Sequence, residues 1–353
     1  MKPLRTAILG CGGFAKRHAQ NLLTQPDLFE LVAFCDVQSS SAQSFAQEYT
    51  QNRAAVFTDH CTLFREIALD LVLICLPPFA HSDEVEQAAA HGVHVFIEKP
   101  IALTSEHAWQ MVRAAESHGI KTQVGFMFRF GAAIERLKCL IEQGAAGPVG
   151  LMSARYFCNH LHADWWRQRS HSGGQLVEQV IHMIDLMRYL MGDPVSVYSL
   201  QNNLFHRNIP EYTVEDVSGT VVGFEQGGIG VLYATNGAIP GKWINDYRLV
   251  AQNLTVDFTN ANNAVITFTN GTALKTETIT SDVNYHLLEL LDLHRAIVED
   301  GATRTPIREG ALSLDLAVAA TQSAESKAVV RLTPHENNPC ALQHAGRQII
   351  GRG

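Results

Sequence analysis

The first third of the chain alternates short apolar runs with longer stretches in which apolar residues recur at helical spacing. The apolar runs are rich in branched residues and lie at residues 4–9, 31–35, 54–57, 71–76, 93–97 and 121–126. Helical periodicity fills the gaps, for example over residues 15–23, 83–91 and 105–118. Apolar strands that alternate with helices are typical of a parallel sheet covered on both faces. Residues 1–125 are therefore predicted to form a doubly wound α/β domain.

The pattern changes after residue 125. Helical periodicity covers residues 134–143, 176–191, 285–299 and 310–328, whereas strand-like runs cover 151–158, 196–200, 218–224, 230–234, 247–251, 255–258 and 264–269. Residues 225–228 and Asn270-Gly271 have the composition of hairpin turns, which join antiparallel strands. Residues 126–334 are predicted to form an α+β domain around a large open, mainly antiparallel sheet. Residues 335–353 show little periodicity, and we expect a disordered C-terminal tail.

Composition and charge exclude several classes of protein. The 353 residues exceed what one core usually serves, which agrees with two domains. A formal net charge of −8 without a basic run argues against binding to nucleic acid or to an anionic membrane. No stretch approaches the ~20 apolar residues of a membrane span, and no signal peptide precedes the first strand. Seven scattered cysteines without a CxxC pair fit a reducing cytoplasm.

The turn after the first predicted strand reads AILGCGGFAKRHA. It matches the pattern G-x-G-x-x-G/A at Gly10, Gly12 and Ala15. Glycines in such a turn let backbone N–H groups approach a pyrophosphate, which faces the positive end of the following helix. We therefore expect this turn, including Gly13 and Phe14, to bind a dinucleotide.

The second predicted strand ends in Asp36. A carboxylate at this position accepts hydrogen bonds from the adenosine ribose and repels the additional phosphate of NADP. Val37 and Gln38 supply no cation that would offset this repulsion, so NAD is predicted rather than NADP. The alternative is an ordinary glycine turn followed by an aspartate that caps a helix.

Further polar residues follow the fourth and fifth predicted strands: Leu76-Pro77-Pro78 with His81, and Glu98-Lys99-Pro100. Ligands of doubly wound folds collect at the carboxyl ends of the strands, which places Lys99 at the mouth of the crevice. Pro100 restricts the backbone of Lys99 and thereby limits where its ammonium group points. Taken alone, Lys99 would equally fit a surface lysine at a strand end.

Together with GFMFRF at residues 125–130, these motifs resemble the glucose–fructose oxidoreductase, inositol dehydrogenase and rhizopine-catabolism family over about residues 4–332. The resemblance implies a Rossmann domain and an open-sheet domain through which subunits form homodimers or homotetramers. It also implies NAD(P)-dependent oxidation of a hydroxyl group, or the reverse reduction, on a sugar, cyclitol or related polyol. Lys99 would lie beside the nicotinamide, and Pro77, His81 and Glu98 would contact the cofactor.

The run GGQLVEQVIHMID at residues 173–185 resembles the family motif G-G-G-x-x-x-D-x-G-x-H-x-x-D. Glu178 and His182 take the positions of the aspartate and histidine that serve the substrate hydroxyl. On one helix, Glu178, His182 and Asp185 would share a polar face with Gln175 and Tyr189. The alternative is an amphipathic helix whose polar face meets water.

The resulting hypothesis has three catalytic residues. His182 removes the hydroxyl proton, and its ordinary pKa of about 6.5 suits reversible transfer near neutrality. Lys99 donates a hydrogen bond to the same oxygen, and Glu178 either orients His182 or binds a neighbouring hydroxyl. We expect Asp185 to hold His182 or a backbone group rather than to bind substrate.

Other residues give weaker signals. Trp166 is expected to line the substrate pocket or to anchor the core, and Arg129 and Tyr156 are further candidate pocket residues. His160 and His162 have no matching third ligand, so no metal is expected. The rival functions are a redox-neutral, NAD-dependent glycosidase and a regulatory protein that senses a dinucleotide. A regulator could dispense with the catalytic lysine and histidine, whose presence here favours an enzyme.

Overall fold

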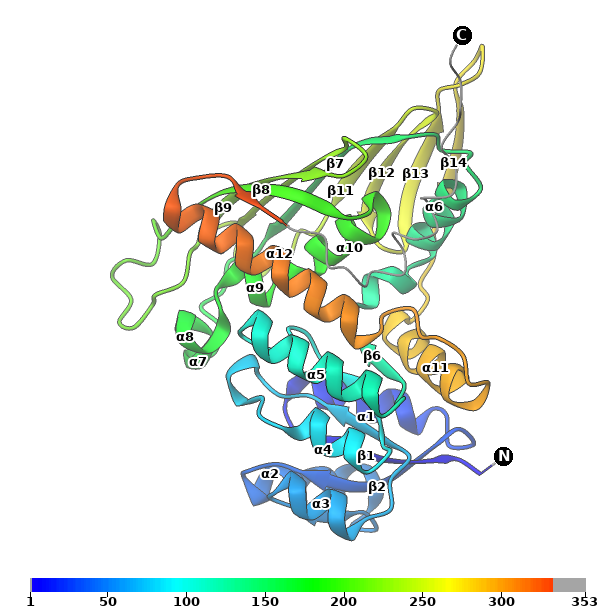
Figure 1. Cartoon of the computed structure of the whole chain (residues 1–353), viewed down its shortest axis with the longest axis vertical. Coiled ribbons are helices and arrows are strands. Elements are labelled where there is room, and N and C mark those ends of the chain that lie inside the picture. Colours follow the sequence, from blue (N-terminus) through cyan, green and yellow to red (C-terminus); the bar gives the residue numbers. More distant parts are fainter. Residues whose placement is uncertain (1, 333–353) are drawn as a thin grey trace.

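The computed structural model of the chain describes residues 2–332, so the expected tail at 335–353 lies outside the described residues. The chain forms two sheets, one above the other in Figure 1, with helices between them. Among the described residues, no helix combines the length and apolar composition that crossing a membrane requires.

The first sheet has six parallel strands in the order β3-β2-β1-β4-β5-β6, which confirms the doubly wound prediction. Its strands are β1 (Leu4–Leu9), β2 (Phe29–Cys35), β3 (Ala55–Phe57), β4 (Leu71–Ile74), β5 (His94–Ile97) and β6 (Thr122–Val124). Its helices are α1 (Gly13–Leu23), α2 (Ser39–Thr50), α3 (His60–Glu66), α4 (Glu84–Ala90) and α5 (Ser105–Ser117), with a short 3₁₀ helix η1 (Pro78–Ala80). The strand order reverses between β1 and β4, where doubly wound folds bind their ligands.

The second sheet has nine strands in the order β14-β13-β12-β11-β7-β10-β9-β8-β15. They are β7 (Val149–Phe157), β8 (Pro194–Asn202), β9 (Val217–Phe224), β10 (Ile229–Thr235), β11 (Tyr247–Ala251), β12 (Leu254–Asn260), β13 (Asn263–Phe268), β14 (Lys275–Ile279) and β15 (Val330–Arg331). Within the described strands of this sheet, only the pairing of β7 with β10 is parallel, so the sheet is mainly antiparallel as predicted. The expected turns at 225–228 and 270–271 connect antiparallel neighbours.

Helices fill the space between the sheets. In Figure 1, α10 (Ile181–Met191) and α12 (Ile307–Ser326) lie beneath the larger sheet, and α12 also packs against α5. The helix α6 (Ala132–Glu142) packs against β13. The apolar side chains of these helices and of the sheet face above them form one continuous core with the first domain.

The helix α11 (Tyr285–Val298) returns to the first sheet, although the chain order places it within residues 126–334. Leu290 and Leu293 are fully buried in the same apolar cluster as Ala15 and Phe29. The second half of the chain therefore completes the packing around α1. It also places polar residues of α11 beside the dinucleotide turn.

The single helix predicted over residues 176–191 is wrong. The chain forms a short α9 (Gln175–Glu178) and then α10, with a break at residues 179–180. Two further short helices, α7 (Asp164–Arg167) and α8 (Arg169–Ser172), precede them. The side chains of Gln175, His182 and Asp185 are buried, which excludes a polar face turned to water.

A buried group of ions joins three helical elements of the second domain. Arg129 lies in the 3₁₀ helix η2 (Met127–Phe130), and its Nε and Nη2 donate to the carboxylate of Asp185 at 2.8 and 2.6 Å. Its Nη2 also donates to Glu309 at 2.7 Å. Arg188 donates to Glu309 at 3.1 Å and to Ser313 at 2.9 Å. Three elements, η2, α10 and α12, are thus fixed to one another.

We predict that Arg129→Met lowers the free energy of unfolding by about 3 kcal/mol, because Asp185 stays buried without its main partner. Urea denaturation followed by circular dichroism measures this value. Arg248→Met is the matched control, since Arg248 and Asp257 form an exposed pair whose loss costs less than about 1 kcal/mol. Equal stability of Arg129→Met and the wild type would contradict the assigned role of this network.

Candidate active site

The glycine turn after β1 has the shape that a dinucleotide requires. Gly10 has a φ of +88°, and a Cβ atom there would lie 2.5 Å from the carbonyl oxygen of Cys75. A Cβ atom at Gly12 or Gly13 would meet nothing within 4 Å, so the surface beside them is open. No side chain within residues 2–332 caps the first turn of α1, whose N–H groups stay available to an anion. The turn therefore fits a pyrophosphate.

Asp36 stands beside this turn, at the end of β2. Its Oδ2 accepts the backbone N–H of Cys11 at 2.8 Å, and its Oδ1 accepts that of Gln38 at 2.8 Å. The carboxylate is only partly buried, so it can also accept hydrogen bonds from a ligand. Asp36 does not cap α2, whose first turn follows Gln38, and the capping alternative is therefore excluded.

The predicted cofactor-binding residues after β4 and β5 differ in their burial and in their hydrogen-bond partners. His81 hydrogen-bonds through Nδ1 to Glu84 at 2.5 Å, and its Nε2 is buried without a partner in the described chain. Pro77 precedes η1 and is partly buried. The side chain of Glu98 points into the protein, where its Oε1 lies 2.6 Å from His18 Nε2.

Lys99 reaches across to the second domain. Its Nζ donates to the backbone oxygen of Glu178 at 2.9 Å and to Glu178 Oε1 at 3.2 Å. The Lys99 side chain is 7% exposed and that of Glu178 16%, so the pair is largely shielded from water. The break after α9 makes the first bond possible, because a continuous helix would use this backbone oxygen within the helix. The other carboxylate oxygen, Oε2, accepts the indole N–H of Trp166 at 2.8 Å.

His182 is buried in the same region, with its ring against Phe126 and Phe128. Burial lowers its pKa well below the ordinary 6.5, and the charges of Lys99 and His286 lower it further. His182 is therefore neutral near pH 7, and the expectation that it keeps an ordinary pKa of about 6.5 is wrong because the ring is buried. Its Nδ1 is buried without a hydrogen-bond partner among residues 2–332.

The supports expected for His182 are not those that the structure shows. Glu178 hydrogen-bonds to Lys99 and Trp166, not to His182. Asp185 is held by Arg129, so the expectation that it holds His182 is wrong. The reason is packing: the turn of α10 that carries Asp185 faces η2 and α12, where a buried guanidinium is available.

The remaining candidates lie at different depths. Tyr156 is buried, and its pKa is raised well above 10 by burial and by nearby Glu178, which places it near the site. Trp166 is both a buried anchor and a partner of Glu178. Arg129 is engaged in the buried ion network, not turned toward the pair of Lys99 and Glu178. The two described clusters with metal-ligand spacing contain neither His160 nor His162.

Four residues around Glu98 and its neighbour His286 were not predicted from the sequence: Arg17 and His18 on α1, and His286 and Glu289 on α11. Arg17 Nη1 lies 2.7 Å from His286 Nε2. His18 follows the glycine turn by one helical turn, so its position facing the sheet was accessible to helical spacing. Nothing in the chain order indicates that α11 returns to α1.

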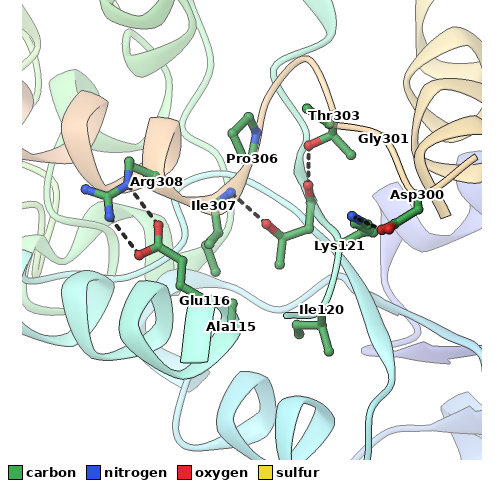
Figure 2. Close-up of a pocket in the computed structure, with 12 residues that line it drawn as sticks. Ala115, Glu116, Ile120, Lys121, Asp300, Gly301, Thr303, Pro306, Ile307 and Arg308 are labelled. Atoms are coloured by element: carbon green, nitrogen blue, oxygen red, sulfur yellow. Dashed lines mark hydrogen bonds and ion pairs between the residues drawn. The ribbon is translucent and has the colours of Figure 1, made fainter. Parts of the chain in front are cut away.

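A pocket of about 390 Å³ lies elsewhere, between the start of β6 and the loop before α12. Figure 2 shows its charged residues paired with each other: Glu116 with Arg308, and Lys121 with Asp300. This pocket lies at the amino end of β6. Lys99 follows the carboxyl end of β5, which runs parallel to β6, so the two lie at opposite edges of the sheet. This pocket is therefore distinct from the dinucleotide crevice.

The Rossmann sheet, its glycine turn and the buried lysine and histidine beyond it define a dinucleotide-dependent oxidoreductase. Comparison with protein families agrees: residues 4–126 match the oxidoreductase family with an NAD-binding Rossmann fold, and residues 134–274 match the C-terminal domain of the same GFO/IDH/MocA family. The chain belongs to this family, and its cofactor is NAD.

Individual relatives are also similar. The D-glucoside 3-dehydrogenase of Escherichia coli (strain K12) is 32% identical over 243 residues, which cover 64% of this chain and 68% of that protein. The scyllo-inositol 2-dehydrogenase (NAD(+)) of Bacillus subtilis (strain 168) is 29% identical over 233 residues, which cover 66% and 67%. Levoglucosan dehydrogenase, solved with NADH and L-sorbose, superposes with a TM-score of 0.87 at 20% identity, covering 94% of this chain and all of that one.

We predict that Asp36→Asn lowers the ratio of the Kd for NADPH to the Kd for NADH by at least about tenfold. The reason is that a carboxylate beside the adenosine ribose repels the additional phosphate of NADPH. The asparagine keeps an acceptor for the N–H of Cys11. Fluorescence titration of the wild type and the variant with both dinucleotides measures the ratio. Glu30→Gln, at an exposed position on the same strand, is the control. An unchanged ratio would show that Asp36 does not select the cofactor.

Proposed function

We propose that this protein is an NAD-dependent dehydrogenase that oxidises a hydroxyl group of a sugar, cyclitol or related polyol, or runs the reverse reduction. The observation that carries the proposal is the contact of Lys99 with Glu178 beside neutral His182, at the carboxyl end of the dinucleotide-binding sheet. The names of the glucoside and inositol dehydrogenases to which the chain is similar support this substrate class.

The chain supplies the proton chemistry. Bound NAD, which the glycine turn and Asp36 would hold, supplies the hydride acceptor. His182 enters the reaction neutral and accepts the proton of the substrate hydroxyl. Lys99 donates a hydrogen bond to the same oxygen and stabilises the negative charge that develops there. Because both side chains are shielded from water, this interaction is stronger than at an exposed site.

Glu178 acts on Lys99 in this mechanism. An ammonium group has three N–H donors, and Glu178 accepts two of them through its backbone oxygen and Oε1. The third remains for the substrate oxygen, so the direction of that hydrogen bond is set in advance. The indole of Trp166 fixes the other carboxylate oxygen. The additional methylene of glutamate, relative to the aspartate of the family motif, lets one side chain bridge Trp166 and Lys99.

We predict that the wild type forms NADH from NAD with at least one member of a panel of cyclitols, aldoses, glycosides and sugar acids. Lys99→Met should lose turnover by about 10²–10⁴-fold, because it removes the hydrogen bond to the reacting oxygen. It should retain NADH affinity, since the glycine turn is unchanged. Absorbance at the NADH band and fluorescence titration measure the two properties.

Lys275→Met, at an exposed position on β14, is the matched control and should behave as the wild type. Normal turnover by Lys99→Met would sink the mechanism. Product release without net NADH would instead identify the redox-neutral glycosidase, and NADH binding without any reaction would identify the dinucleotide sensor.

We propose further that a second copy of the chain covers the outer face of the nine-stranded sheet. Cross-strand neighbours on that face carry exposed apolar side chains, including Leu151 opposite Ile229 and Val221 opposite Tyr198. Contiguous exposed apolar surface of this kind is typical of a protein interface. The family's habit of forming homodimers or homotetramers through this sheet agrees with the proposal.

We predict that the double variant Val221→Lys/Ile229→Lys is monomeric at concentrations at which the wild type is a dimer or tetramer, because buried lysines at an interface cannot be solvated. Size-exclusion chromatography with light scattering measures the mass. Retained NADH binding would show that the variant is folded. Leu274→Lys, at an exposed position outside this face, is the control. A monomeric wild type would refute the proposal.

We also propose that the protein works in the reducing cytoplasm. The six cysteines within the described residues are all free, and Cys11, Cys35 and Cys158 are buried. Free thiols are typical of a reducing compartment, whereas disulfides form and persist in an oxidising one. Fractionation of cells that produce the protein would test this, and recovery from an oxidising compartment would contradict it.

A further inference from the structure

Two carboxylates meet in the interior of the first domain. Glu98 follows β5, Glu289 lies on α11, and both are buried. With His18 they form a group in which one nitrogen or carboxylate oxygen of each side chain lies within 4.8 Å of the others. Like charges at this separation, away from water, are strongly unfavourable, so the group requires a neutralising partner.

The two carboxylates are unequally supported. Glu98 accepts a hydrogen bond from His18 at 2.6 Å and another from the backbone N–H of Lys99 at 3.3 Å. Glu289 is 0% exposed, and neither of its oxygens has a hydrogen-bond partner in the described chain. His286 Nδ1 lies 3.5 Å from Glu289 Oε1, but burial lowers the pKa of His286 to about 4, so this ring is neutral near pH 7. An ionised Glu289 carboxylate in this position would be buried without a hydrogen bond or counter-ion that stabilises its charge.

We propose that Glu98 and Glu289 share one proton, and that Glu289 is thereby a positioning residue that keeps Glu98, and through it Lys99, in place. The role of Lys99 in this inference rests on the proposed function. No bond to carbon is made or broken: Glu289 carries the proton, and Glu98 remains the ionised acceptor of His18 and of the Lys99 backbone.

The charged and titratable groups around the pair agree with this distribution. Burial and then the charge of Glu98 raise the pKa of Glu289 well above its ordinary 4.5. Burial alone would raise the pKa of Glu98, but the hydrogen bond and charge of His18, followed by the charge of Lys99, lower it. The groups that face the pair come from every element packed against it: Arg17 and His18 on α1, Cys75 after β4, Lys99 after β5, and His286 on α11.

The position of Glu98 is narrowly defined. A Cβ atom at Gly125 would lie 2.8 Å from Glu98 Oε2, so the absence of a side chain there makes room for the carboxylate. Loss of the shared proton would place a second negative charge beside Glu98 and repel it from this site. Because Glu98 accepts the backbone N–H of Lys99, such a shift would change the direction of the lysine side chain.

The test compares Glu289→Gln with Glu289→Ala in the full-length protein. Glutamine imitates the neutral acid, so it should keep kcat near the wild-type value at pH 7. Alanine removes the group that holds Glu98 and should lower kcat by about tenfold to a hundredfold, with an unchanged KM for NAD. In the wild type, kcat/KM should fall when the pair loses its proton at high pH. In Glu289→Gln, which has no such proton to lose, this fall should be absent over the same pH range.

A second measurement does not depend on the substrate. The folded protein binds a proton at Glu289 above pH 4.5 that the unfolded chain has lost, so stability decreases as pH rises from 4.5 through the folded-state pKa. Glutamine has no such proton to lose. The thermal midpoint of Glu289→Gln minus that of the wild type should therefore increase as pH rises through this range.

Each other outcome overturns the inference. A midpoint difference that does not vary with pH would show that Glu289 is not protonated in the folded state. Equal kcat for the alanine and glutamine variants would remove the positioning role. One equivalent of a divalent metal in the purified protein, lost in Glu289→Gln, would show that a cation and not a proton neutralises the pair. A wild type without turnover would instead contradict the proposed function, and the thermal measurement would still decide whether the proton is shared.

Discussion

The hydrogen bond from Lys99 to the backbone oxygen of Glu178 connects the two halves of the molecule at the site of the proposed chemistry. Lys99 comes from the end of a Rossmann strand, and Glu178 from the last turn of a short helix in the second domain. The bond is possible because the helix stops there and leaves this carbonyl without an intrahelical backbone partner. An interruption that weakens a helix thus supplies the acceptor that orients a buried ammonium group.

Other buried contacts between the two halves of the chain hold the elements that carry Lys99 and Glu178 in fixed positions. The buried ions around Arg129 fix η2, α10 and α12 to one another, and α10 carries His182. The helix α11 packs against α1 through Leu290 and Leu293, which makes the second half of the chain part of the first domain's core. The position of Lys99 relative to His182 therefore depends on packing shared by both domains, and not on a flexible connection.

Local patterns predicted the sheets well, because the strands are apolar and their spacing is regular. The glycine turn and the position of Asp36 after β2 were also predictable, since neighbouring residues along the chain determine them. The break at residues 179–180 was not, because its energetic compensation comes from Lys99, 79 residues away in sequence. The partner of Asp185 was missed for the same reason, since Arg129 lies on a separate element. The strand β14, Lys275–Ile279, is too polar to show strand-like apolar alternation, and only its pairing with β13 reveals it.

Many ionisable groups can be buried beside one cofactor crevice because each of them is either paired with an opposite charge or neutral. Two acidic side chains contact Lys99: Glu178 accepts a hydrogen bond from its Nζ, and Glu98 accepts one from its backbone N–H. A neutral His182 adds no charge, and a protonated Glu289 adds none either. A charge on His182 or Glu289 would disturb this balance, because charges interact strongly where water is excluded. Burial thus does more than exclude water: it keeps two groups neutral, so that the charge on Lys99 is balanced by residues of fixed position.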